Sequence, residues 1–63
     1  SPLSDREQKV LQLLVQGLRD RDIGEKLFIS PSTVKFHLNN VMGKLGSKNR
    51  YQAVYQATIQ GLI

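Results

Sequence analysis

The chain has 63 residues, of which nine are Lys or Arg and five are Asp or Glu, so its formal net charge is +4 at pH 7. It contains no cysteine and one histidine, which excludes disulfides, a thiolate metal site, a cysteine nucleophile and a histidine-based zinc site. No apolar run approaches the roughly 18 residues of a membrane-spanning helix, so the composition predicts one small folded domain with an anionic partner.

The first predicted helix covers about residues 5–16. Ser4 and Glu7 have the spacing of a capping box, in which each side chain bonds a backbone N–H that the start of the helix leaves free. Gly17 is a natural stop. Apolar residues recur at helical spacing, so we assign to the core Val10, Leu11, Leu14 and Leu18.

The second predicted helix is short, about residues 20–27, with Asp20 as a plausible N-cap. Ile23 and Leu27 lie four residues apart and share the side that we assign to the core. Gly24 inside the helix costs about 1 kcal/mol relative to alanine. We therefore expect another stretch of backbone to approach Gly24 closely.

The third predicted helix runs over 31–45. Ser30 is a favoured N-cap, Pro31 suits the first helical position, and Gly46 ends the helix. Only about three residues separate this helix from the preceding one, which is the arrangement of a helix-turn-helix. Ile29, in this connection, is assigned to the core.

The two sides of the helix predicted over 31–45 differ in chemistry. At about 100° per residue, one narrow apolar stripe must face the core, and it consists of Val34, Leu38, Val41 and Leu45. The opposite side has hydroxyls, amides, a lysine and a phenyl ring but no carboxylate: Ser32, Thr33, Lys35, Phe36, Asn39 and Asn40. These groups suit base edges in a DNA major groove, where Asn pairs with adenine and Lys reaches guanine. A merely solvated helix face is the alternative.

Charge is distributed unevenly along the chain. Residues 1–25 have four basic and five acidic residues, a net charge of −1, whereas residues 26–63 have five basic and no acidic residues, a net charge of +5. The basic part includes the helix over 31–45 and the start of the next one, where free backbone N–H groups also attract phosphate. This distribution favours a nucleic acid as the anionic partner.

The last predicted helix covers about residues 50–60, with Asn49 and Gln52 as a looser capping box and Gly61 as its stop. Small residues on one side are assigned to the core: Ala53, Val54 and Ala57. A second side cannot be buried by the same small bundle, and we predict it to be a homodimer interface formed by Tyr51, Tyr55, Thr58, Ile59 and Leu62. Partial exposure of amphipathic tyrosines is the alternative.

No strand pattern or repeat occurs, so the predicted fold class is all-α, a four-helix bundle that contains a helix-turn-helix. The chain resembles the LuxR/NarL/FixJ-type (GerE-like) helix-turn-helix DNA-binding domain of bacterial transcription regulators. The resemblance covers nearly the whole chain, through residues 3–7, 10–11, 17, 22–24, 27, 29–37, 40–41, 44–46 and 49–54. Three residues depart from the family pattern: Arg19 replaces a frequent Ser or Thr, Gly24 replaces a usual Ala, and Phe36 is bulky for its position.

The resemblance implies sequence-specific binding of double-stranded DNA, with the helix over 31–45 in the major groove and dimerisation through the helix over 50–60. The residues assigned to base readout are Lys35, Phe36, Asn39, Asn40 and Thr33. Those assigned to phosphate are Ser32, His37, Lys44, Lys48 and Arg50. No catalytic residue, metal or cofactor is expected, and His37 is interpreted as a packing residue or a phosphate neighbour.

We expect residues 1–63 to be the C-terminal DNA-binding domain of a longer regulator, preceded by a phosphorylatable receiver or by a small-ligand-binding domain. The expected location is the bacterial cytoplasm, at the nucleoid, which suits a chain without cysteine. A different function is a sigma-factor-like helix-turn-helix module acting within RNA polymerase, and self-association without polymerase would distinguish the two. An enzyme is not expected, because no acid–base pair accompanies a nucleophile. A membrane-surface role is disfavoured by the scattered basic residues.

Overall fold

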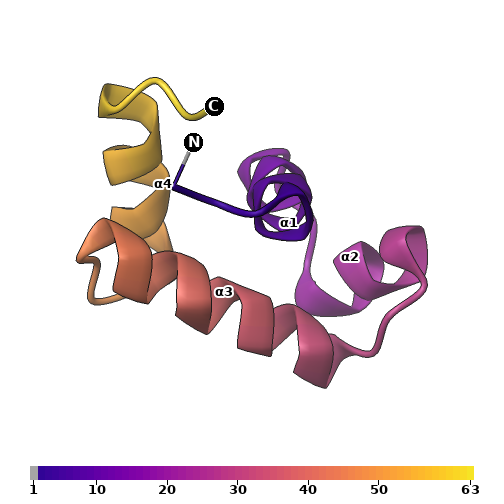
Figure 1. Ribbon diagram of the computed structural model, residues 1–63. Helices are drawn as coiled ribbons and strands as arrows, with labels where there is room; N and C mark the ends of the chain where they lie inside the picture. The colour runs from indigo at the N-terminus through magenta and orange to yellow at the C-terminus, as the bar shows by residue number, and fades with distance from the viewer. Residues whose placement is uncertain (1) are drawn as a thin grey trace.

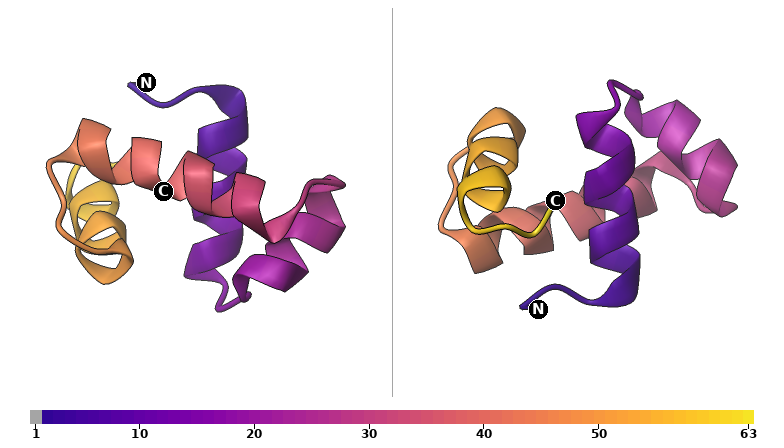
Figure 2. Two further views of the ribbon diagram at one scale, coloured as in Figure 1. Left: turned by 90° about the horizontal axis from the view of Figure 1, so that it is seen from below. Right: turned by 90° about the horizontal axis from the view of Figure 1, so that it is seen from above.

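The computed structural model describes residues 2–63, which form four helices and no strand: α1 (Asp5–Val15), α2 (Asp20–Leu27), α3 (Pro31–Leu45) and α4 (Arg50–Ile59). The all-α prediction is confirmed, and every helix boundary lies within one residue of its predicted place. The long helix α3 contacts the other three helices (Figure 1). Figure 2 shows α1 crossing α3 steeply, with α2 and α4 at opposite ends of α3. Within residues 2–63, no helix combines the length and apolar character needed to cross a membrane.

The capping box at the start of α1 is present as predicted. The backbone N–H of Glu7 donates to Ser4 Oγ at 3.2 Å, and the backbone N–H of Ser4 donates to Glu7 Oε1 at 3.0 Å. Ser30 caps α3 in the predicted way, because its Oγ accepts the backbone N–H of Thr33 at 3.1 Å. These caps depend on residues three positions apart, so local sequence is sufficient to predict them.

Two predicted caps need correction. Arg19, not Asp20, occupies the N-cap position of α2, and Asp22 Oδ2 accepts the backbone N–H of Arg19 at 3.4 Å. Asn49 caps α4 as predicted, but Gln52 Oε1 accepts the N–H of Lys48 at 2.5 Å, so no bond returns to Asn49 itself. In α2 the reason is physical: the Asp20 carboxylate is engaged by a side chain from another helix.

The turn between α2 and α3 folds the chain back over Gly24. Phe28 has the left-handed backbone conformation, with φ 59° and ψ 41°, and the N–H groups of Phe28 and Ile29 both donate to the carbonyl oxygen of Gly24. A Cβ atom on residue 24 would lie 2.5 Å from the carbonyl oxygen of Ile29. The predicted close approach of another backbone is therefore present, and it fixes the direction in which α3 leaves the turn.

The core consists of two neighbouring clusters. One joins α1, α3 and α4 and contains Leu3, Leu11, Val41, Leu45, Ala53 and Ala57. The other joins α1, α2 and α3 and contains Val10, Ile23, Val34 and Leu38. Nine of the residues assigned to the core are buried, and the other five are half-buried against these clusters: Leu14, Leu18, Leu27, Ile29 and Val54. Leu3 is a buried residue that the sequence pattern did not identify, because it precedes the first helix.

Candidate nucleic-acid interface

The outer side of α3 is a polar, exposed surface without carboxylates. Lys35, Phe36, Asn39 and Asn40 are all exposed, as is Ser32 near the start of the helix. Thr33 is half-buried, and its hydroxyl lies 3.0 Å from the hydroxyl of Ser30 in the N-cap. The fold therefore presents four of the five residues assigned to base readout on one accessible helix side, whereas Thr33 is occupied by the cap.

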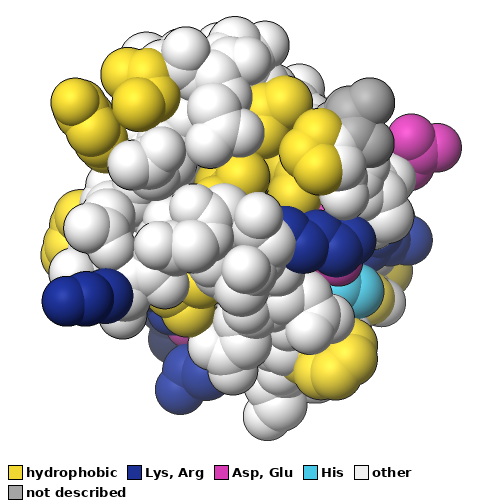
Figure 3. All heavy atoms as spheres, turned by 60° about the vertical axis from the view of Figure 1, so that its left-hand side comes forward, with side chains coloured by type: hydrophobic (Ala, Val, Ile, Leu, Met, Phe, Trp, Pro, Cys, Tyr) yellow, Lys and Arg dark blue, Asp and Glu magenta, His cyan; other side chains and the backbone are white. Residues whose placement is uncertain are grey.

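Phe36 and His37 form an aromatic pair at the edge of this side. Their ring centroids are 5.7 Å apart with an interplanar angle of 64°, an edge-to-face arrangement. The phenyl ring is exposed and the imidazole is half-buried. The histidine is visible at the molecular surface in Figure 3. His37 thus packs against the exposed ring of Phe36 and does not fill the core.

Lys44 is held by a buried carboxylate. Its Nζ lies 2.6 Å from Oε1 of Glu7, whose side chain is only 8% exposed. The hydrogen bond from Lys44 lowers the pKa of Glu7, and the backbone N–H of Ser4 acts in the same direction. This contact joins the start of α1 to the end of α3. Lys44 consequently has a structural role that sequence reasoning missed, and it is not a free cation for phosphate.

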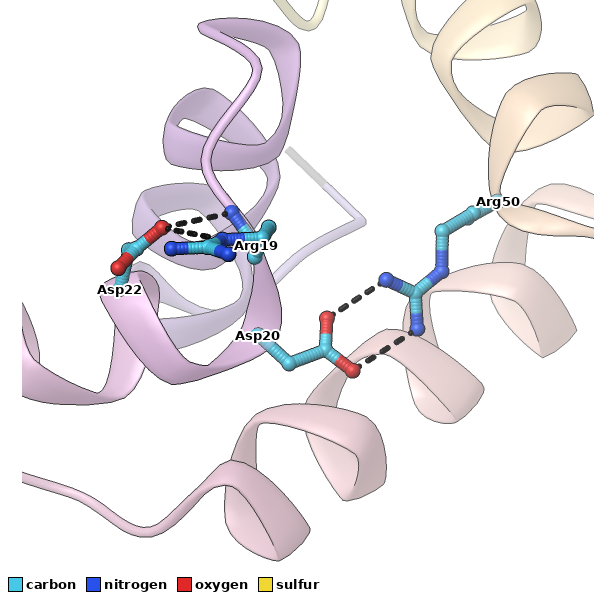
Figure 4. Close-up of polar contacts among 4 residues, drawn as sticks. All are labelled: Arg19, Asp20, Asp22 and Arg50. Atoms are coloured by element: carbon cyan, nitrogen blue, oxygen red, sulfur yellow. Dashed lines mark hydrogen bonds and ion pairs between the residues drawn. The ribbon is translucent and has the colours of Figure 1, made fainter.

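Arg50 is also paired. Its Nη1 lies 2.6 Å from Asp20 Oδ1, and its Nη2 lies 3.2 Å from Asp20 Oδ2, a bidentate contact between the starts of α4 and α2 (Figure 4). The hydrogen bonds from Arg50 lower the pKa of Asp20, and those same bonds raise the pKa of the guanidinium. The acidic and basic parts of the sequence are therefore not separated in space, because the fold pairs members of each.

Two of the basic residues assigned to DNA contact are unpaired in the part of the chain that the structure describes. Within residues 2–63, neither Lys35 nor Lys48 forms an ion pair, and both are exposed. Lys35 also lines an open groove of about 640 Å³ between the starts of α2, α3 and α4. Arg19 and Arg21 line this groove too. Sequence reasoning did not select these two arginines, because they lie in residues 1–25, where the net charge is −1.

Tyrosine and isoleucine side chains remain exposed on α4. Tyr51 is 82% exposed, and Tyr55 and Ile59 are exposed by at least 60%. Hydrophobic side chains reach the surface on the α4 side of the molecule, where Lys and Arg outnumber Asp and Glu (Figure 3). Thr58 is exposed as well, with its hydroxyl bonded to the carbonyl oxygen of Val54 at 2.8 Å.

Leu62 does not belong to this exposed side, which corrects the prediction. The helix ends at Ile59, and Gly61 has a φ of 73°, which turns the chain back toward the bundle. The N–H of Leu62 donates to the carbonyl oxygen of Ala57 at 2.8 Å, and its carbonyl oxygen accepts from Gln8 Nε2. Its side chain packs against the core cluster around Leu3. The helical spacing used to place Leu62 ends before that residue.

Comparison with known sequences identifies a family. The model of the family described as "Bacterial regulatory proteins, luxR family" (GerE) matches residues 1–57. The uncharacterized transcriptional regulatory protein YxjL of Bacillus subtilis (strain 168) is 45% identical over 62 residues, which are 98% of this chain and 28% of YxjL. The spore germination protein GerE of the same organism is 46% identical over 59 residues, which are 94% of this chain and 80% of GerE.

Two solved structures share the fold. The response regulator ChrA of a heme-sensing two-component system superposes with a TM-score of 0.92 and 51% identity, over 97% of this chain and 30% of that chain. The transcription factor GerE superposes with a TM-score of 0.94 and 39% identity, over 98% of this chain and 92% of that chain. The chain thus spans under a third of YxjL and of ChrA but most of GerE.

Proposed function

The chain belongs to the luxR family of bacterial regulatory proteins, a family of DNA-binding transcription regulators and not of enzymes, and from this premise we propose that it binds double-stranded DNA sequence-specifically with α3 in the major groove. The observation that carries the proposal is the outer side of α3. It is exposed, free of carboxylates and rich in amides. A major groove about 12 Å wide admits one helix, and amide and ammonium groups match the donor and acceptor pattern of base edges.

Within this side, Lys35, Asn39 and Asn40 are the proposed readers of base edges, and Phe36 is the proposed apolar contact to a thymine methyl group. Their exposure supports these roles. Thr33 is the least suited of the residues assigned to base readout, because its hydroxyl is hydrogen-bonded with that of Ser30. Asparagine has a low helix propensity. Two adjacent asparagines on an exposed side of α3 therefore add little to helix stability, and a role in recognition explains them better.

Phosphate contacts would supply most of the affinity and fix the orientation of the domain on the duplex. The proposed contacts are Lys48, Ser32 and His37, together with Arg50 once it leaves its carboxylate partner. Lys48 is exposed and unpaired within the described chain, just before the first turn of α4. A helix start attracts phosphate through its free N–H groups, and Lys48 adds a full positive charge there.

A homodimer through α4 is the proposed state on DNA. Tyr51, Tyr55 and Ile59 supply an exposed apolar side, and Thr58 lies beside them. A two-fold dimer would place two α3 helices on half-sites about 10 bp apart. The family match favours this regulator over a sigma-factor module working inside RNA polymerase. We also propose that the chain serves as the DNA-binding domain of a longer cytoplasmic regulator, as the lengths of YxjL and ChrA suggest.

The test combines a randomised-site selection with salt titration of DNA affinity. Lys48→Ala should weaken binding to every duplex and reduce the slope of log affinity against log salt by about 1. Lys9→Ala is the matched control, since Lys9 is an exposed and unpaired lysine on α1. Asn39→Ala should instead change the selected sequence. Equal effects of the two lysine changes, or an unchanged selected sequence, would contradict the proposed orientation.

A further inference from the structure

Asp20 places a carboxylate among the groups that we propose for the DNA side. It is the first residue of α2, and both its oxygens accept hydrogen bonds from Arg50, the first residue of α4. The Asp20 side chain is 16% exposed and that of Arg50 is 33% exposed, so the pair lies partly within the surface. Figure 4 shows the guanidinium reaching across from α4 to meet the carboxylate end-on.

The surroundings of this pair are basic. The groove between the starts of α2, α3 and α4 is lined by four cationic side chains, Arg19, Arg21, Lys35 and Arg50, and by one carboxylate, that of Asp20. Arg19 is itself paired with Asp22 at 3.1 Å, outside the lining. Lys35 is unpaired within residues 2–63 and projects from the proposed reading helix. Because Lys35 belongs both to the proposed reading helix and to the lining of the groove, a DNA strand that Lys35 contacts would lie at this groove.

Resting on the proposed function, we propose that Asp20 competes with a DNA phosphate for Arg50, so that binding exchanges a carboxylate for a phosphate on the same guanidinium. Arginine binds both anions through pairs of parallel N–H groups, and Asp20 already accepts from Nη1 and Nη2 of Arg50. A phosphate brought close to Arg50 would also meet the negative charge of Asp20. The pair therefore holds Arg50 back from DNA until the exchange occurs.

The exchange of Asp20 for a phosphate on Arg50 changes the affinity of the chain for DNA but not its preference for one DNA sequence over another. Phosphate contacts contain no sequence information, so the cost of opening the pair is the same on every duplex. Partly exposed ion pairs are weak, and opening one lowers affinity by about fivefold. Removing the carboxylate should therefore tighten binding to specific and random-sequence duplexes by the same factor of about five. The slope of log affinity against log salt should stay the same, because Arg50 contacts the phosphate in the parent chain and in the variant alike, and only the cost of freeing Arg50 differs.

Asp20→Asn is the test, since it keeps the side-chain size and removes the charge. Glu25→Gln is the matched control: Glu25 is an exposed carboxylate on the same helix, without an ion pair in the described chain. Both variants change the net charge by one, so general attraction to DNA is matched. If thermal unfolding shows that Asp20→Asn does not fold, Asp20→Ser takes its place, because serine also suits a helix start.

Repeating Asp20→Asn in an Arg50→Gln background completes the design. We expect Asp20→Asn to tighten binding about fivefold, Glu25→Gln to have little effect, and most of the gain to vanish without Arg50. A gain that persists without Arg50 would overturn the competition, because Asp20 would then act on DNA by its own charge. Weaker binding by Asp20→Asn, or equality with Glu25→Gln, would overturn it as well. If the unaltered chain fails to bind any duplex, the proposed function fails instead.

Discussion

Replacing Phe28 by glycine should stabilise the fold. The left-handed backbone of Phe28, with φ 59°, places its Cβ against the following carbonyl, at a cost of about 1–2 kcal/mol. Its side chain is 94% exposed, so removal loses almost no buried surface. Glycine has more conformational freedom in the unfolded chain, which offsets about 0.5–1 kcal/mol of the gain. The net expectation is a stabilisation of about 0.5–1 kcal/mol, or roughly 4 °C in the unfolding midpoint of a domain this small.

Urea and thermal unfolding followed by circular dichroism would measure this difference. Phe28→Ala is the control, because it removes the phenyl ring but keeps the Cβ atom and its strain. We expect that variant to lie within about 0.5 kcal/mol of the parent chain. A destabilised Phe28→Gly variant would refute the reasoning from backbone strain. A loss of more than about 1 kcal/mol in Phe28→Ala would show that the ring packs against the fold.

Three further predictions concern stability and association. Glu7→Gln should lower the free energy of unfolding at pH 7 by about 2 kcal/mol, because it removes the charge from the hydrogen-bonded contact with Lys44. Since the folded pKa of Glu7 lies below its ordinary value of 4.5, its stabilisation is present above pH 4.5 and is lost as the pH falls through the folded pKa. Urea unfolding from pH 7 to 3 should therefore show a smaller loss of stability in Glu7→Gln than in the parent chain, where Asp20 and Glu7 both contribute to the loss. Gly24→Ala should lower the free energy of unfolding, measured in urea, by about 1 kcal/mol. The added Cβ would lie 2.5 Å from a backbone oxygen, and that overlap outweighs the better helix propensity of alanine. A stabilised variant would mean that the turn shifts freely. Tyr55→Glu should prevent self-association on a two-site duplex in sedimentation while the monomer stays folded. Phe28→Glu, at an exposed apolar residue that follows α2, should leave association intact. An unaffected Tyr55→Glu would exclude this side of α4 as the interface.

The helices and most caps could be predicted because their determinants are local. Ser4 with Glu7 and Ser30 with Thr33 act over three residues, and the structure shows those bonds. Gly24 was informative for a similar reason: a costly residue inside a helix indicates a packing need, and the returning backbone supplies it.

The long-range polar contacts could not be predicted from pattern. Glu7 and Lys44 are 37 positions apart, and Asp20 and Arg50 are 30 apart. Periodicity shows which side of a helix a charge occupies, but not which charge from another helix meets it. For that reason the sequence suggested a separated basic half, whereas the fold pairs two of its cations with carboxylates.

Leu62 and Phe28 show a second limit of periodicity. Leu62 was placed by continuing the helical spacing of α4 past its end, but the left-handed turn at Gly61 returns it to the core. Phe28 adopts a conformation that phenylalanine seldom prefers, and no local residue pattern signals it. In both cases the backbone direction after a helix end determines the outcome.

The most direct test of the central claim is an amide chemical-shift titration of the 63-residue chain with the duplex recovered by selection. We predict that the largest changes fall on the outer side of α3, at Lys35, Phe36, Asn39 and Asn40, and at Lys48, with small changes on the exposed side of α1. Changes centred on α1, with the outer side of α3 unaffected, would contradict DNA reading by α3.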